Sequence, residues 1–294
     1  MRLCTKGDIL RTHVMRPTWH FVAAEDIRWM LMLSSERIKA AVMSYAKGHF
    51  GKIEKTLFTR CLDQIGKILE GYKSLTKQEV TAELQKSGIL PTIDHVNLFL
   101  TWGEVEGIVC SGIDKGKKTT YALLDERVPP TRELCREEAL ARLASRYFQS
   151  HSPAQLQDFV WWSGLTATEC RLAINLIKAE LMTETFDSRE YFIHQSWKGK
   201  NESEPVLRLL PAFDEYLISY KNRTDVLPLE HHPKAFNRFG TFYPIILYNG
   251  KIIGNWSRSI KKKHHSNRMD IFREEAPHSS EINPAGRSAD RRFL

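Results

Sequence analysis

The stretch that decides the fold is TKQEVTAELQKSGILPTIDHVNLFLTWGEVEGIVCSGIDKGKKTTYALL, residues 76–124. Thr76 followed by Glu79 predicts a capping box, in which the hydroxyl and the carboxylate each bond a backbone N–H left free at a helix start. Thr92 predicts the N-cap of the next helix. The β-rich runs that follow, around a turn rich in glycine and lysine, predict a hairpin. The stretch therefore predicts two helices and a β-hairpin.

The same order extends outward in both directions. Apolar residues at helical spacing in residues 56–71 predict a preceding helix. Downstream, residues 131–150 predict a helix, and Ser152 predicts an N-cap with Gln155 completing the capping box. A helix capped by Thr166 and a strand-like run around a polar turn follow. Three helices and a hairpin form the order of a winged helix-turn-helix, and the chain shows it twice.

In the C-terminal part, the stretch FYPIILYNGKIIGNWSRSI contains β-rich runs. Asn249 and Gly250 separate two such runs and predict a hairpin, because both residues tolerate a positive φ. The expected fold class is therefore α+β: tandem winged helix-turn-helix domains followed by a small β-rich, barrel-like domain. The expected boundaries are 51–127 and 128–200 for the winged helices and 201–294 for the C-terminal domain.

Composition excludes several classes of protein. The chain has 294 residues and a net charge of +8, which permits nucleic-acid binding but does not establish it. No apolar run approaches the ~18 residues of a membrane span, and the residues MRLCTKGDIL lack the apolar region of a signal peptide. A cytoplasmic, nucleoid-associated location is therefore expected. The five cysteines form no CxxC pair, and the histidine pairs lack ligand neighbours. No nucleotide-binding or hydrolase motif occurs. We therefore expect no metal and no cofactor.

Residues 11–31, RTHVMRPTWHFVAAEDIRWML, predict a strand that begins near Ile9 and a helix that follows it. No upstream partner for this strand is evident. Its backbone groups are therefore expected to stay unpaired along an edge, which would leave residues 1–25 mobile or prone to aggregation. Polar residues that alternate along this strand suggest either a face for DNA or a half-buried structural strand; these residues are His13, Arg16, Thr18 and His20.

Five segments in collinear order carry a resemblance to a known family: ILRTHVMRPTWHFVAAEDIRWML, IVCSGIDKGKKTTYALLDERVP, DFVWWSGLT, LLPAFDEYLISYKNR and ILYNGKIIGNW. Together they resemble the AlkZ-like winged-helix DNA glycosylases over nearly the whole chain. The resemblance implies a row of winged helices and a barrel-like domain arranged around duplex DNA. It also implies hydrolysis of the N-glycosidic bond of alkylated or cross-linked bases.

The resemblance further implies that residues 1–50 are the remnant of a first winged helix, consisting of its wing strand and the following helix. In the family, a Gln-X-Gln or Gln-X-Asp element that positions the attacking water precedes this wing. The sequence has Gln155-Leu156-Gln157, but in a later winged helix, where capping already explains Gln155. The chain is therefore expected to bind DNA without catalysis. An alternative is a complete glycosylase whose start codon lies further upstream.

The expected partner is double-stranded DNA, alkylated DNA included, and the protein is expected to be a monomer. A winged-helix transcription regulator or protein-interaction module is the alternative from another class. The expected DNA-binding residues are basic, polar or aromatic side chains on the wings, on the third helix of the 128–200 winged helix and in the C-terminal domain. They are Arg11, His13, Arg16, Thr18, His20, Lys115, Lys117, Lys118, Arg171, Tyr220, Arg258, Lys261, Lys262 and Lys263.

Overall fold

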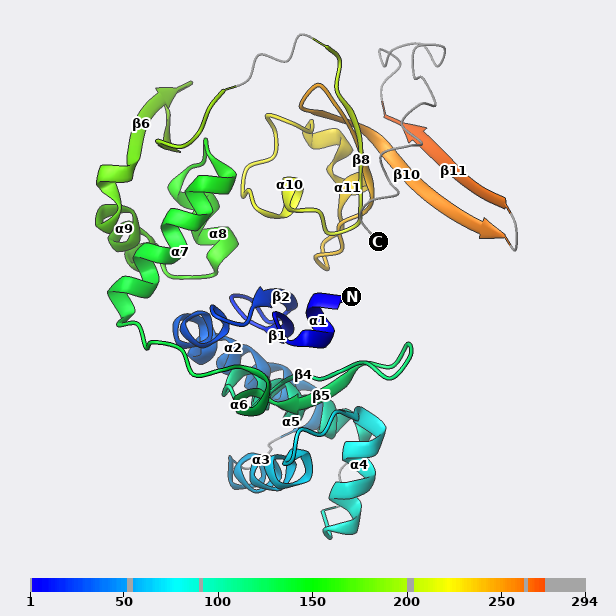
Figure 1. Ribbon diagram of the computed structural model, residues 1–294. Coiled ribbons are helices and arrows are strands. Elements are labelled where there is room, and N and C mark those ends of the chain that lie inside the picture. Colours follow the sequence, from blue (N-terminus) through cyan, green and yellow to red (C-terminus); the bar gives the residue numbers. More distant parts are fainter. Residues whose placement is uncertain (1, 52–54, 90–91, 200–203, 262–263, 273–294) are drawn as a thin grey trace. The chain divides into compact units, whose positions relative to one another are not determined.

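The structure is a computed structural model that describes residues 2–51, 55–89, 92–199, 204–261 and 264–272 (Figure 1). The chain divides into two units, Met1–Trp197 and Lys198–Leu294. The first unit is largely helical with three small antiparallel sheets, and the second is built on one four-stranded sheet.

The first unit begins with a β-hairpin. Its elements are α1 (Arg2–Lys6), β1 (Ile9–His13), β2 (Trp19–Ala23) and α2 (Ile27–Phe50). β1 pairs antiparallel with β2, with Ile9 opposite Ala23 and His13 opposite Trp19. The prediction of one strand without a partner is therefore wrong, and the mobility expected for residues 1–25 loses its premise. The stretch pairs with itself because the chain reverses between the strands, where Met15 adopts a left-handed φ of 64° and Pro17 cannot donate a ladder hydrogen bond.

Three helices and a three-stranded sheet follow. They are α3 (Lys55–Leu69), β3 (Leu75–Thr76), α4 (Lys77–Lys86), α5 (Ile93–Val105), β4 (Val109–Ser111) and β5 (Thr120–Leu123), with sheet order β3-β5-β4. The Thr76–Glu79 capping box and the Thr92 cap, which accepts from the His95 N–H, are confirmed. The hairpin of β4 and β5 is confirmed too. Side chains of α2, including Ile38 and Val42, complete the hydrophobic core of this group.

The order then recurs after the short α6 (Leu124–Arg127). Its elements are α7 (Arg136–His151), α8 (Leu156–Ser163), α9 (Ala167–Leu176), a 3-10 turn η1 (Lys178–Glu180), β6 (Leu181–Phe186) and β7 (Arg189–His194). The Thr166 cap is confirmed. The Ser152 cap is wrong. The Ser152 hydroxyl donates to the Phe148 carbonyl and accepts the His194 N–H at 2.8 Å, so β7 engages it instead. Gln155 is the N-cap of α8, and its N–H donates to Asp158 Oδ2 at 2.9 Å.

The second unit holds β8 (Leu207–Leu210), β9 (Ile245–Tyr248), β10 (Lys251–Lys261) and β11 (His264–Ile271), with three short helical turns: α10 (Glu215–Ile218), η2 (Leu229–His231) and α11 (His232–Ala235). The Asn249–Gly250 hairpin is confirmed, with φ values of 45° and 76°. Among the described residues the strand order is linear, β11-β10-β9-β8, so the sheet does not close there and the barrel-like form is not confirmed.

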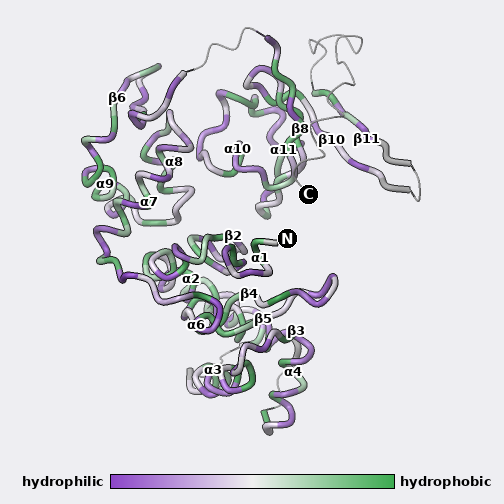
Figure 2. The backbone as a smooth tube through the Cα atoms, in the orientation of Figure 1, coloured by the Kyte–Doolittle hydropathy of each residue, from purple (hydrophilic) through white to green (hydrophobic). Residues whose placement is uncertain are grey.

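Hydrophilic and hydrophobic residues are interspersed along α2 and α7 (Figure 2), as expected for helices that bury one face. α2 is 24 residues long. Within the described ranges, no helix combines the length and the apolar character that a membrane crossing requires.

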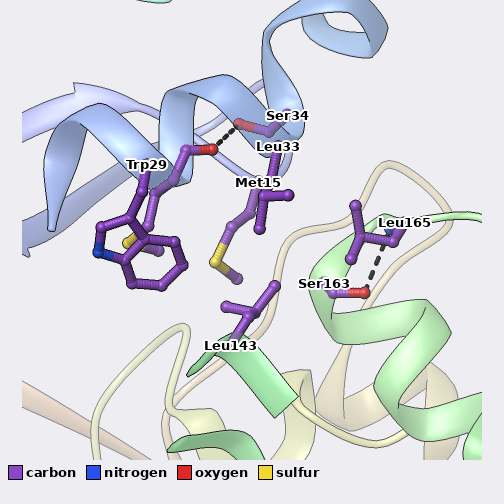
Figure 3. Close-up of a pocket in the computed structure, with 8 residues that line it drawn as sticks. Met15, Trp29, Leu33, Ser34, Leu143, Ser163 and Leu165 are labelled. Carbon is purple, nitrogen blue, oxygen red and sulfur yellow. Dashed lines mark hydrogen bonds between the residues drawn. The ribbon is translucent and has the colours of Figure 1, made fainter. Parts of the chain in front are cut away.

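The turn of the β1–β2 hairpin packs against the C-terminus of α8. Gly164 ends α8 with a φ of 70°, and a Cβ atom built there would lie 2.8 Å from the Met15 carbonyl oxygen. The Met15 side chain lies among apolar residues of α2 and α7, close to Ser163 and Leu165 (Figure 3). The space they enclose is about 10 Å³, roughly the room for one water molecule and too little for a ligand.

A buried carboxylate joins α2 to α7 beside this turn. Asp26 is 4% exposed; it accepts the Trp29 indole N–H at 2.9 Å and pairs with Arg146 of α7. The Arg146 guanidinium also lies 5.8 Å from the centre of the Trp29 ring. The N-terminal hairpin and its following helix are thus fixed to α7 and α8 by packing and by a paired charge.

We predict that Gly164→Ala lowers the free energy of unfolding more than Gly88→Ala does. Both glycines have a left-handed φ at a helix end, 70° and 76°, but nothing lies within 4 Å of a Cβ added at Gly88. Backbone strain of about 1 kcal/mol should be common to both. The clash with Met15 should add about 1–3 kcal/mol to Gly164→Ala alone. Urea unfolding of the two variants decides this, and equal losses would contradict the close contact.

Candidate nucleic-acid interface

One face of the β1–β2 hairpin carries basic and aromatic side chains. Arg11 lies opposite Phe21 and His13 opposite Trp19, so the four residues share a face because strand side chains alternate. Trp19 is 48% exposed and Phe21 is 70% exposed. The opposite face, which includes Leu10, is buried in the core.

The Trp19 ring is held by its two basic neighbours. The guanidinium carbon of Arg11 lies 4.2 Å from the centre of the Trp19 ring, within the range of a cation–π contact. The His13 ring lies 5.5 Å from it at an interplanar angle of 51°. Arg11 and His13 of β1 therefore fix the Trp19 side chain, while about half of its surface stays accessible to solvent.

A buried carboxylate orients His13. Glu104 of α5 is fully buried, and its Oε2 atom accepts a hydrogen bond from His13 Nδ1. The other oxygen, Oε1, has no hydrogen-bond partner among the described residues. Burial first, and the nearby Glu104 carboxylate second, raise the pKa of Tyr121 to about 12. The pKa of Cys110 is likewise raised to about 12, first by burial. Glu104 thus sits in a poorly solvated interior where a charged-group hydrogen bond is strong.

The other predicted residues of this stretch do not lie on one strand. His13 ends β1, Arg16 and Thr18 lie in the connection, and His20 lies in β2. The predicted alternation along a single strand is therefore wrong, because the chain reverses at residues 14–18. Arg16 and His20 are half-buried, and Thr18 Oγ1 lies 3.0 Å from His20 Nε2.

The lysines of the β4–β5 hairpin differ from one another. Lys115 Nζ lies 2.8 and 2.9 Å from the two carboxylate oxygens of Glu79, the capping residue of α4. This hydrogen bond, followed by those from Thr76, lowers the pKa of Glu79 to about 2. Lys117 and Lys118 are exposed and form no ion pair with any described residue. The charges of these two lysines are therefore the ones this hairpin can offer to a phosphate.

The β1–β2 and β4–β5 hairpins of the first unit are neighbours. The Arg11 backbone N–H donates to the Ser111 hydroxyl of β4 at 2.9 Å, which joins β1 to β4 (Figure 1). The structure thus places residues 11–20 beside the sheet from which the lysine turn extends. Arg171 is exposed on α9 and is not part of this contact.

In the second unit, Arg258 is exposed on β10 and Tyr220 is half-buried just after α10. Lys261 ends β10, whereas Lys262 and Lys263 lie outside the described residues. Within the part of the chain that the structure describes, no group of three histidine, cysteine or carboxylate side chains could hold a metal ion.

Gln155 and Gln157 form a local structure at the start of α8. Gln155 is 7% exposed, and its amide oxygen accepts a hydrogen bond from the Gln157 amide nitrogen. Its backbone N–H is bonded to Asp158. The amide oxygen of Gln155 is thus engaged within the first turn of the helix.

Sequence reasoning missed Trp19, Phe21 and Glu104. A signal for Glu104 was present, since a carboxylate within the apolar run LFLTWGEV requires a buried partner. The alternation of Trp19 and Phe21 on one strand was visible too, but their exposure depends on the tertiary packing that buries the opposite face of the hairpin.

The chain is similar to known proteins in sequence and in fold. A family model described as DNA glycosylase AlkZ-like matches residues 1–280. The chain is similar to the interstrand DNA cross-link repair glycosylase of Streptomyces sahachiroi, with 22% identity over 263 residues, which is 84% of this chain and 70% of that protein. The solved structure of Streptomyces sahachiroi DNA glycosylase AlkZ has a similar fold, with a TM-score of 0.73 and 19% identity over 94% of this chain and 77% of that one.

We predict that Glu79→Gln destabilises the protein more at pH 7 than at pH 3. The pKa of Glu79 in the folded protein, about 2, is depressed from its ordinary value of 4.5. The ionised carboxylate therefore stabilises the folded state above about pH 4.5, and this stabilisation is lost as the pH falls towards 2. Urea unfolding at both pH values measures the difference. Glu83→Gln is the control, because Glu83 forms an ion pair with Lys86 of the same helix and its side chain is partly exposed. Equal losses for Glu79→Gln at both pH values would contradict the prediction.

Proposed function

The chain belongs to the DNA glycosylase AlkZ-like family, and from this membership we propose that it binds duplex DNA that carries damaged bases. The relative from Streptomyces sahachiroi is named as a glycosylase that repairs interstrand cross-links. Cross-linked and alkylated bases are therefore the lesions we propose for this chain.

The observation that carries the proposal is the charge and shape of the two neighbouring hairpins. Residues 9–23 contain two arginines and two histidines and no acidic residue. The turn of the β4–β5 hairpin adds the exposed Lys117 and Lys118. Cations on the surface of these two hairpins suit the phosphates of a duplex, which supply most of the sequence-independent affinity.

We interpret the two groups of three helices and a hairpin as winged helices, with the domain boundaries expected from the sequence. In such domains the third helix usually enters the major groove and the wing contacts the backbone. Here α5 packs against α2 and β1 and buries Glu104 in their interior. We therefore assign the DNA contacts of this winged helix to its wing, the β4–β5 hairpin, and assign a packing role to α5.

We also propose that these 294 residues bind DNA without releasing the damaged base. Glycosidic hydrolysis needs a polar group that holds water within hydrogen-bond reach, about 2.6–3.2 Å, of the reacting atoms. The only Gln-X-Gln element in the sequence is Gln155–Gln157. Gln155 is 7% exposed and caps α8, which supports a structural role for it.

We predict that Lys117→Ala with Lys118→Ala flattens the dependence of log affinity on log salt by about two units, since each phosphate-bound lysine contributes about one. Lys115→Ala should change the slope by less, because Glu79 pairs with its ammonium group. Fluorescence anisotropy with an undamaged duplex at several salt concentrations measures the slope. An unchanged slope in the double variant would show that Lys117 and Lys118 do not contact phosphates. Failure of the wild-type chain to bind duplex DNA would instead favour a protein-interaction module.

We predict that the chain releases no N7-alkylguanine from alkylated duplex DNA under conditions in which it binds that DNA. Chromatography of released bases measures this for the wild type and for the variant with Gln155→Ala and Gln157→Ala. Clear release by the wild type that the double variant loses, with its circular dichroism spectrum unchanged, would make Gln155–Gln157 the catalytic element and overturn the proposal.

A further inference from the structure

We infer that Trp19 and Phe21 form a stacking platform for one unpaired base of duplex DNA, and that Arg11 and the His13–Glu104 pair hold Trp19 in place. The inference rests on the proposed function, because it specifies which feature of damaged DNA the first hairpin contacts. The four hairpin residues lie on one face, and Glu104 supports it from α5.

The first argument is the exposure of two large aromatic side chains on the same face of the hairpin. Trp19 is 48% exposed and Phe21 is 70% exposed, two residues apart on β2. Exposed apolar surface of this kind marks contact sites when it is contiguous and rimmed by polar groups. Bases stack on aromatic rings whatever their identity, since every base has a π face.

The second argument is preorganisation. The Trp19 ring lies against the Arg11 guanidinium at 4.2 Å and against the His13 ring at 5.5 Å. His13 is itself fixed by a fully buried carboxylate. Burial of Glu104 is costly unless the carboxylate is paired. Its partner is His13, and the His13 ring supports the exposed Trp19 indole. A fixed ring loses little conformational entropy on binding, which favours affinity.

The third argument is the charge around the platform. Residues 9–23 contain two arginines and no acidic residue. Positive charge beside an exposed aromatic surface favours a ligand that combines a flat apolar face with anionic groups. A nucleotide has both, whereas an apolar peptide has only the first.

The occupant is an unpaired base because a paired base hides both of its faces in the stack. A base leaves the duplex at the lowest cost where pairing is already lost through damage or mismatch. The platform would therefore favour DNA with a disrupted pair over intact duplex, while the lysine turn contributes equally to both.

The test compares two duplexes of one sequence, one fully paired and one with a single bulged 2-aminopurine, at one salt concentration. We expect the wild-type chain to bind the bulged duplex more tightly and to quench the 2-aminopurine fluorescence, as stacking on an aromatic ring does. Phe21→Leu should reduce the ratio of the two affinities by about tenfold, the effect of losing one base-stacking contact. Phe21 is mostly exposed, so this substitution keeps an apolar side chain and leaves the core intact.

Phe186→Leu is the matched control, because Phe186 is 72% exposed on the β6–β7 hairpin. It should leave both the ratio and the quenching as in the wild type. Trp19→Phe should retain more of the ratio than Trp19→Ala, since it keeps a ring. Glu104→Gln tests the positioning role: it should lower the quenching, which a loss of general DNA affinity alone would not do once the duplex is saturated.

Equal effects of Phe21→Leu and Phe186→Leu would overturn the inference, as would a wild-type chain that binds both duplexes equally. Either result would leave the proposed function standing. Absence of salt-dependent binding to the paired duplex would instead show that the proposed function itself is wrong.

Discussion

The hydrogen bond between the His13 imidazole and the Glu104 carboxylate is the contact on which the first unit depends. Glu104 is fully buried on α5, and a buried carboxylate that loses its partner costs about 3–5 kcal/mol. The bond therefore fixes the end of β1 against α5. Because β2 pairs with β1 along its whole length, fixing His13 also fixes Trp19 and the turn between the strands.

Ion pairs also join other elements of the first unit to one another. Asp26 at the start of α2 pairs with Arg146 of α7. The capping glutamates Glu79 and Glu169 are each bound by a cation from another element, Lys115 and Arg136. Glu79 and Glu169 each accept the backbone N–H of the N-cap residue, Thr76 or Thr166, and also tie that helix start to a neighbouring element. Helix capping, a local effect in the sequence, thus becomes part of the tertiary structure.

Much of the fold could be predicted from local signals. The Thr76–Glu79 and Thr166–Glu169 boxes mark helix starts because hydroxyl and carboxylate lie three residues apart. Asn249–Gly250 marks a hairpin through backbone conformation alone. Ser152 failed as a cap because β7, distant in sequence, takes its hydroxyl. The pairing of β1 with β2 was missed because residues 14–18 contain no glycine, and a left-handed Met15 is invisible in the sequence.

The candidate site was predicted less well, for a physical reason. Arg11 and His13 were expected as DNA contacts, but their partners Trp19 and Glu104 were not, since cation–π stacking and burial depend on which strand and helix meet. Lys115 was expected to contact DNA, yet its ion pair with Glu79 crosses from the hairpin to α4. The family resemblance suggested the partner, duplex DNA. Only the contacts in the structure separate charges that are already paired within the protein from charges left for a ligand.

The most direct test of this account is amide hydrogen exchange of residues 9–23, measured without and with saturating duplex DNA that contains an unpaired base. The account predicts that the paired amides of β1 and β2 exchange as slowly in the free protein as those of β4 and β5, and that DNA further slows exchange in residues 14–21. Fast exchange throughout residues 9–23 in the free protein would contradict the anchored hairpin. If DNA slows exchange elsewhere but leaves the exchange rates of residues 14–21 unchanged, the proposed role of the β1–β2 hairpin in binding is contradicted.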